Sequence, residues 1–291
     1  MLARFVSVLR DKRRELRQVG LGIAILIFIV GFFLAIRNAP HEILHLRLPI
    51  LAAYAIFLPP ITYLIQSVEL RLSAKAVGIT LTRKQAIEIV VYSNASTLLP
   101  IPGGLLTRAA ALRANGVTVV RSASVVILFT GIAGSISFAY SGAWVLFQQP
   151  LLGLAAFTTA LLGAAICFKL SRKLDVPRAI LSKDVALRIF TVLFETGCFI
   201  VIFAAIGASI TVQQAAFLVV SGFIAMALTI FPSGFGIREA IVALLSPLVG
   251  VDPATAFLAA AAGRIVGLLW MAALGIVILV TGTAQEGAAE Q

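Results

Sequence analysis

The chain has 291 residues, of which 60% are hydrophobic and only 12% are charged, and its mean hydropathy is +1.07. A soluble globular protein carries about 45–50% apolar and about 25% charged residues, so this composition excludes a soluble enzyme and a disordered chain. It predicts an all-α polytopic membrane protein. The two cysteines, Cys167 and Cys198, lie in apolar runs and predict neither a disulfide framework nor a metal cluster.

Residues 1–18 form a basic segment in which Leu2, Phe5, Val6 and Leu9 fall on one face of a helix. This pattern predicts an amphipathic segment that binds anionic lipids of the inner leaflet. Apolar runs long enough to cross a bilayer, which takes about 20 residues, then follow at 20–36, 49–67, 122–146, 151–169, 186–207 and 254–280.

The connection after the first run contains His41 and His45 in the pattern H-E-x-x-H, which occurs in zinc proteases. Zinc catalysis needs both histidines on one helical face and a third ligand. The space between Pro40 and Pro49 leaves room for only about two helical turns, and the chain has no third histidine. We therefore expect a turn of interfacial helix and no metal site. The sequence also contains no Walker-type loop or dinucleotide fingerprint, so we expect no cofactor.

The distribution of basic residues predicts the orientation. Most of them, 18 of 23, lie in four segments: 1–18, 68–85, 103–121 and 169–183. The alternate connections contain only Arg37 and Arg47. Because Lys and Arg accumulate on the cytoplasmic side, we expect both termini, including a short tail at 282–291, to be cytoplasmic in the plasma (inner) membrane.

Two further apolar segments, 86–115 and 214–248, are each interrupted by proline and glycine. The first divides into arms of about 16 and 13 residues, which as helices would measure only about 24 and 20 Å. We therefore expect two re-entrant broken-helix hairpins, the first entering from the cytoplasm and the second from outside. Their tips contain Pro102, Gly103, Gly104, Pro232, Gly234 and Gly236.

The segments 102–110 and 232–240 resemble each other, because the proline, the second glycine, an arginine and the final alanine coincide. A single transmembrane domain at 19–281 would then consist of two inverted halves, about 19–146 and 151–280. Each half would hold two spans, a hairpin and a span, which gives six transmembrane helices in total. Transporters commonly combine such repeats with broken helices that meet at a midplane substrate site. The alternative is a pair of unrelated Pro/Gly kinks. The pair Pro59-Pro60 predicts a break in the second span.

The second half contains the motif Phe231-Pro-Ser-Gly-Phe-Gly-Ile-Arg-Glu-Ala, followed by Gly250-Val251, Arg264, Trp270 and Gly275. In these residues the chain resembles the membrane region of the lysylphosphatidylglycerol synthase/flippase-like family. The first half resembles the family at Gly78-Ile79-x-Leu81 and at Pro100-x-Pro102-Gly103-Gly104 with Arg108. The chain departs from the family at Leu105 and at 128–131, where an acidic residue and an Asp-Arg pair are frequent. The resemblance covers about 20–280 and implies a lipid-translocating unit without the soluble synthase domain.

Five charged residues fall within or beside the apolar segments, where a charge at mid-bilayer costs about 2.5–3.5 kcal/mol on insertion scales. They are the candidate substrate-binding residues Arg108, Glu195, Arg238, Glu239 and Arg264. Helix N-termini after the tips suit a phosphate, and the two repeat-related arginines add bidentate hydrogen bonding. We expect Arg238 and Arg264 to face one polar cavity, with Glu195 as counter-ion or proton carrier. The alternatives are a static ion-pair network and, for Arg108, a side chain that extends to the cytoplasmic interface.

These features predict a flippase-like transporter that moves a phospholipid or a lipid-linked anion between leaflets without ATP. We expect no catalytic residues and no nucleic-acid partner. A non-catalytic accessory protein of lipid or cell-envelope synthesis remains an alternative, as does a membrane-embedded transferase or metalloprotease.

Overall fold

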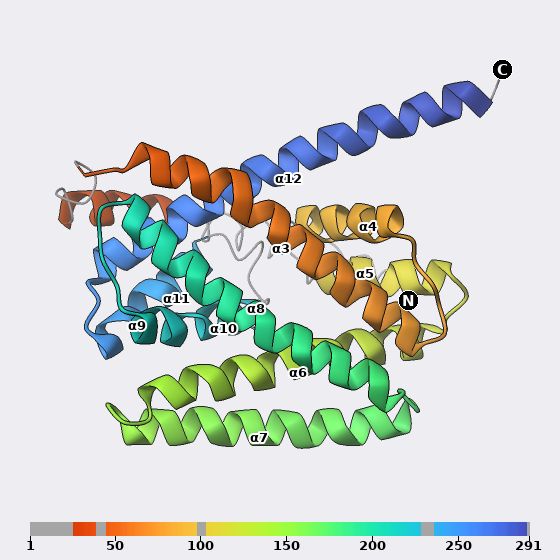
Figure 1. The fold of residues 1–291 in the computed structure, drawn as a ribbon, viewed down its shortest axis with the longest axis horizontal. Coiled ribbons are helices and arrows are strands. Elements are labelled where there is room, and N and C mark those ends of the chain that lie inside the picture. The colour runs from red at the N-terminus through yellow and green to blue at the C-terminus, as the bar shows by residue number, and fades with distance from the viewer. Residues whose placement is uncertain (1–25, 39–44, 98–102, 228–235, 290–291) are drawn as a thin grey trace, which may run out of the picture.

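The computed structural model describes residues 26–38, 45–97, 103–227 and 236–289, with side chains described as far as 280. All regular structure in these ranges is helical, and the helices form an elongated bundle (Figure 1). Five helices are long and apolar enough to cross a membrane: α3 (Leu48–Ala76), α6 (Val119–Val145), α7 (Pro150–Lys173), α8 (Arg178–Ala205) and α12 (Pro253–Ala289) as far as Val280. The fold is therefore that of a multi-pass membrane protein.

Five of the six predicted spans are confirmed as long apolar helices. The run at 20–36 is described only from Leu26, as a helix over Leu26–Asn38. Large apolar side chains lie on the outside of the bundle, for example Leu161 and Phe147, which are 70% and 89% exposed. A bilayer solvates such a surface, whereas small residues serve the contacts between helices. Accordingly, a Cβ at Gly142 of α6 would lie only 2.9 Å from the Cβ of Ala156 on α7.

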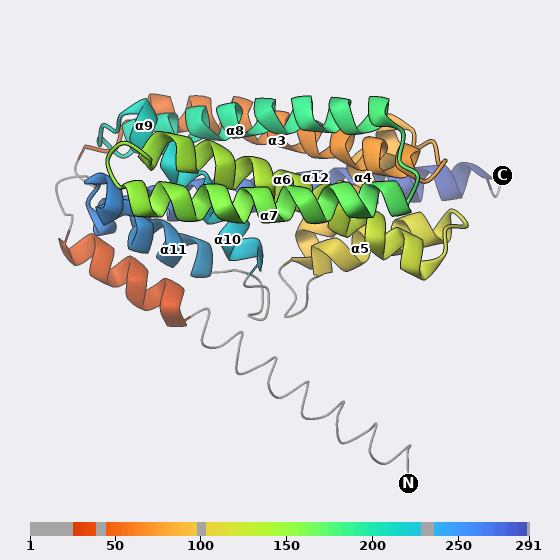
Figure 2. The same ribbon diagram turned by 90° about the horizontal axis from the view of Figure 1, so that it is seen from below.

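The two interrupted segments are short helices at opposite ends of the bundle (Figure 2). At one end lie α4 (Arg83–Ser96) and α5 (Gly103–Ala114). At the other end lie α9 (Val212–Leu218), α10 (Val220–Ala227), α11 (Ile237–Leu245) and the 3-10 helix η2 (Ser246–Val249). The first arm of the second segment is thus two consecutive helices that meet at Val219, which keeps helical angles. The predicted tip residues Pro102, Pro232 and Gly234 lie outside the described residues.

The turn before α4 and the turn before α9 are built alike. Gly78 and Gly207 both have positive φ, at 84° and 88°, and each ends the preceding long helix. Four residues later Thr82 and Thr211 cap the next helix, each in a capping box with the glutamine three residues on. The sequence therefore repeats a Gly-x-(Thr/Ser)-(Leu/Ile)-Thr-x-x-Gln-Ala motif after about 130 residues, with the same backbone geometry.

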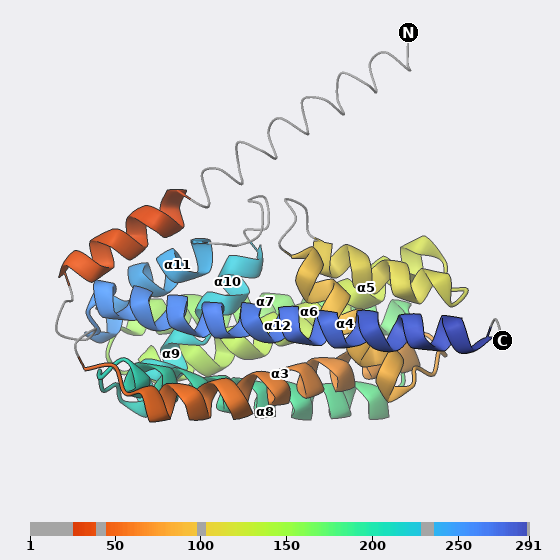
Figure 3. The same ribbon diagram turned by 90° about the horizontal axis from the view of Figure 1, so that it is seen from above.

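The turn before α6 and the turn before α12 are also alike. Gly116 and Gly250 have φ values of 88° and 72°, and both are followed by Val and then by a helix-capping residue. Thr118 accepts a hydrogen bond from Arg121 N, and Asp252 accepts one from the corresponding backbone N–H of α12. Figures 1 and 3 show that α8 runs opposite to α3 and α12 opposite to α6.

The pair Pro59-Pro60 does not break the second span, because α3 is one helix from Leu48 to Ala76. Each proline removes the backbone donor that would bond the carbonyl four residues earlier. Trp270 of α12 supplies one replacement, since its Nε1 donates a hydrogen bond to the carbonyl of Ala55. The contact between helices therefore satisfies a polar group that the proline leaves without its helical partner.

The two ends of the bundle differ in charge. At the end that holds α4 and α5, the chain also turns from α7 into α8 (Figure 2). The basic residues at this end are Arg71, Lys75, Arg83, Lys84, Arg113, Arg121, Lys169, Arg172, Lys173, Arg178 and Lys183. At the opposite end, the described basic residues outside the cavity are Arg37, at the end of the helix over Leu26–Asn38, and Arg47, in the turn before α3.

Candidate functional site

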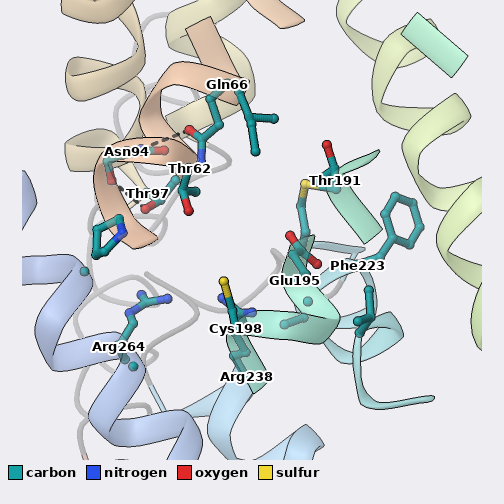
Figure 4. Close-up of a pocket in the computed structure, with 18 of the residues that line it drawn as sticks. Thr62, Gln66, Asn94, Thr97, Thr191, Glu195, Cys198, Phe223, Arg238 and Arg264 are labelled. Atoms are coloured by element: carbon teal, nitrogen blue, oxygen red, sulfur yellow. Dashed lines mark hydrogen bonds between the residues drawn. The ribbon is translucent and has the colours of Figure 1, made fainter. Parts of the chain in front are cut away.

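A cavity of about 570 Å³ lies in the middle of the bundle, between elements from both halves of the chain. Its walls include polar side chains of α3 and α4, such as Thr62, Gln66 and Asn94, on one side (Figure 4). Arg238 of α11 and Arg264 of α12 extend into the same space from the other side. The structure thus places polar groups from segments far apart in sequence around one internal volume.

The structure brings most of the described candidate residues to this cavity. Its lining includes Arg108, Glu195, Arg238 and Arg264, so Arg238 and Arg264 share one cavity. The described tip residues Gly103 and Gly104 also line it.

Glu239 does not line the cavity. It is fully buried in the first turn of α11, next to the capping residue Gly236, whose φ of 77° is left-handed. The charges that act on Glu239 most strongly are those of Arg264 and Arg238. Its carboxylate therefore balances the two guanidinium groups from behind the cavity wall.

Glu195 lines the cavity from α8, as does Cys198 (Figure 4). The four ion pairs found among the described residues do not include Glu195 or Arg238. The charge that acts most strongly on Glu195 is nevertheless that of Arg238. Glu195, Arg238, Glu239 and Arg264, here called the Arg238 cluster, therefore carry two positive and two negative charges, with Glu195 and both arginines open to the cavity.

Arg238 rests against the backbone of α10. A Cβ at Gly222 would lie 3.6 Å from Nη2 of Arg238, which is an ordinary van der Waals contact. A larger side chain at this position would occupy the place of the guanidinium group. A small residue at position 222 thus leaves room for the guanidinium group of Arg238.

A second charged cluster lies at the other end of the cavity. One oxygen of Glu69, on α3, accepts a hydrogen bond from Arg108 at 2.9 Å and lies 2.6 Å from Nη2 of Arg188. Asp184 is completely buried one turn before Arg188 on α8, and their side chains are 3.5 Å apart. These four residues, here called the Glu69 cluster, join α3, α5 and α8 through a shared carboxylate. Arg108 is thus turned inward to the cavity and Glu69, and it does not follow the alternative in which its side chain extends to the cytoplasmic interface.

Sequence reasoning missed Glu69, Asp184 and Arg188. The predicted second span ended at residue 67, so Glu69 was counted within a basic connection, whereas α3 continues to Ala76. Asp184 and Arg188 have the i, i+4 spacing of a helical ion pair, and this spacing could have predicted that they interact. That spacing does not reveal the partner on α3, because Glu69 and Arg188 meet only in the folded bundle.

Backbone contact closes the first broken segment. A Cβ at Gly103 would overlap with the carbonyl oxygen of Ser96, so α5 begins directly against the end of α4. Ser93 Oγ donates to the carbonyl of Gly104 at 3.0 Å, and Thr107 Oγ1 donates to Ser96 Oγ at 2.9 Å. Arg108 follows one turn later and is therefore held at the cavity wall by a rigid pair of helices.

The described residues contain no group of three His, Cys, Asp or Glu side chains that could hold a metal ion. His45 is described in the turn before α3, whereas His41 lies outside the described residues. The H-E-x-x-H pattern thus remains without a third ligand in the part of the chain that the structure describes.

Comparisons of the chain with protein-family models, with curated proteins and with solved structures give no match. The chemistry of the cavity is therefore the basis on which function is inferred.

Proposed function

We propose that the protein is a flippase-like membrane transporter for a phosphate-bearing lipid or a lipid-linked anion, which moves between leaflets without ATP. The observation that carries this proposal is the polar cavity within an apolar helix bundle, into which Arg238 and Arg264 both extend. Ionisable residues at membrane depth are costly and usually mark a substrate pathway. A static structural role would require neither an open volume nor guanidinium groups that face it.

The electrostatics favour an anionic substrate. Arg108 and Arg188 are both bound to Glu69, whose carboxylate offsets part of their positive charge. Arg238 and Arg264 present two guanidinium groups to the cavity. Of the two carboxylates in the Arg238 cluster, Glu195 lines the cavity and Glu239 does not. Guanidinium groups bind phosphate in bidentate fashion, and Arg238 lies in the first turn of α11, where the helix dipole also favours an anion. We therefore assign the substrate phosphate to Arg238 and Arg264.

The architecture supports alternating access. The repeated turns before α4 and α9, and before α6 and α12, together with the opposite directions of the long helices, support two inverted halves. In this proposal α4–α5 and α9–α11 are re-entrant hairpins that enter from opposite faces of the membrane. The sixth span is the segment at 20–36. Rocking of one half against the other would expose the Arg238 cluster to each side in turn.

The charge distribution supports an orientation. The end of the bundle that holds α4 and α5 also holds most of the described basic residues, and this end is cytoplasmic in our proposal. The termini would then be cytoplasmic and the membrane would be the plasma (inner) membrane. The resemblance to the lysylphosphatidylglycerol synthase/flippase-like family agrees with this function, since its motif residues Arg108, Arg238 and Arg264 all line the cavity.

A liposome assay tests the proposal. Purified protein is reconstituted, and the movement of fluorescent phosphatidylglycerol between leaflets is followed by external quenching. Arg238→Ala should abolish movement and Arg238→Lys should preserve part of it, because lysine keeps the charge but loses the planar fork. Gly222→Leu should act like Arg238→Ala by displacing the guanidinium group, whereas Gly222→Ala should be tolerated.

The matched control is Arg113→Ala, which removes an exposed arginine from α5. Full lipid movement by a folded, inserted Arg238→Ala variant would contradict the assignment and would favour a static ion-pair cluster. If the protein moves free glycerol phosphate and not the lipid, the anion site stands but its substrate is a soluble phosphate.

A further inference from the structure

We propose that the transporter is a proton–anion symporter in which Glu195 takes up one proton when the substrate phosphate binds at Arg238. This inference rests on the proposed function and adds its coupling ion, its stoichiometry and the residue that carries the proton.

The position of Glu195 makes it accessible to both substrate and proton. It lines the cavity on α8, and Arg238 extends into the same space from α11 (Figure 4). No ion pair among the described residues involves its carboxylate. The other carboxylates are less suited. Glu69 is bound by two arginines, while Asp184 and Glu239 are completely buried and do not line the cavity.

Burial disfavours the charged form of Glu195, so this form depends on neighbouring positive charges that the substrate would engage. Arg238 provides the strongest attraction and Arg188 the next, but Arg188 is already bound to Glu69 at 2.6 Å. A phosphate at Arg238 would cancel the first attraction and add a negative charge nearby. Both changes favour the neutral acid.

The titratable and charged groups around Glu195 come from five helices. They are Arg188 and Cys198 on α8, Tyr54 and Glu69 on α3, Arg108 on α5, Arg238 on α11 and Arg264 on α12. Cysteine and tyrosine are ordinarily neutral near pH 7, and arginine is always charged. Within this set, Glu195 is therefore the carboxylic acid that lines the cavity and forms no ion pair with another described residue.

Charge balance supplies an independent reason for coupling. The empty Arg238 cluster sums to zero, with two arginines and two glutamates. A bound monoanion would leave one uncompensated negative charge at membrane depth, where each such charge is costly. Uptake of one proton by the Glu195 carboxylate, with formation of its O–H bond, restores the sum to zero. The loaded and empty cavities then carry the same charge, and the proton leaves Glu195 when the anion is released on the other side.

The test is proton uptake on binding. Purified protein in weakly buffered detergent is titrated with dihexanoyl phosphatidylglycerol while a dye reports bulk pH. This ligand is a phosphodiester, so it lacks the second ionisation near about pH 6 of a phosphomonoester. We expect about one proton taken up per ligand bound and, over the pH range in which free Glu195 is ionised, a Kd that rises about tenfold per pH unit.

Glu195→Gln should bind without proton uptake and with a Kd that does not change with pH. Glu88→Gln, which alters an exposed ion pair with Lys84 on α4, is the matched control and should behave like the wild type. In liposomes a pH gradient should drive accumulation of fluorescent phosphatidylglycerol in one leaflet by the wild type. A membrane potential without a pH gradient should not, because the loaded and empty forms carry equal charge.

The outcomes separate the two proposals. Ligand binding and lipid movement without proton uptake, or uptake that persists in Glu195→Gln, would overturn the coupling and leave the transporter intact. A response to membrane potential alone would overturn the stoichiometry of one proton per anion. Failure to bind or move any phosphate-bearing ligand, lipid or glycerol phosphate, would overturn both.

Discussion

Removal of the Glu69 carboxylate should destabilise the protein more than any exposed charge change, because this group joins three helices. In Glu69→Ala, Arg108 loses its carboxylate partner at 2.9 Å and keeps the hydroxyl of Ser93 at 3.3 Å. Arg188 loses its carboxylate partner at 2.6 Å and keeps Asp184 and the carbonyl of Phe129, both at 3.5 Å. Breaking a buried ion pair from one side costs about 3–5 kcal/mol, since the remaining charge is buried and unpaired. With about 2–4 °C of melting temperature per kcal/mol for chains of this size, we expect a decrease of roughly 10 °C.

The assay is thermal unfolding of the purified protein in detergent. Glu88→Ala removes a carboxylate from an ion pair of 4.0 Å whose side chains are 57% and 31% exposed, and it should cost no more than about 0.5 kcal/mol. Glu69→Ala combined with Arg108→Ala should recover part of the loss, because one unpaired charge is removed with its partner. Equal melting temperatures for Glu69→Ala and Glu88→Ala would refute the reasoning, and so would additivity in the double variant.

Three further predictions follow from the packing and the orientation. Gly103→Ala should cost about 1–3 kcal/mol by forcing α5 away from α4, whereas Gly197→Ala, which has open space at its Cβ, should stabilise α8 slightly; equal thermal shifts would contradict this. Trp270→Phe should cost about 1–3 kcal/mol, because a carbonyl of α3 is left without a donor; an unchanged melting temperature would show that another group bonds it. In a protein without native cysteines, an impermeant external thiol reagent should label Ser209→Cys and spare Lys173→Cys, and the reverse pattern would invert the proposed orientation.

The elements that depend on local composition could be predicted from the amino-acid sequence. Long apolar runs are sufficient to predict a membrane-crossing helix, and five of them are helices in the structure. Proline and glycine clusters predicted where the two interrupted segments divide, although the first arm of the second is α9 followed by α10. The position of Arg238 and Arg264 at the same cavity was also predictable, because charged side chains in apolar segments usually face the protein interior or a cavity and not the lipid.

Which charged groups share a carboxylate, and which of them face the cavity, depends on how the helices pack. Glu69, Arg108 and Arg188 come from three helices, and no spacing along the chain relates them. Glu239 follows Arg238 directly, yet the helical turn places one side chain behind the cavity wall and the other within the cavity. Pro59-Pro60 leaves α3 continuous because Trp270, more than 200 residues later, bonds a carbonyl that the prolines release. Helix composition is a local property, whereas the partner of a buried polar group is chosen by the packing of distant helices.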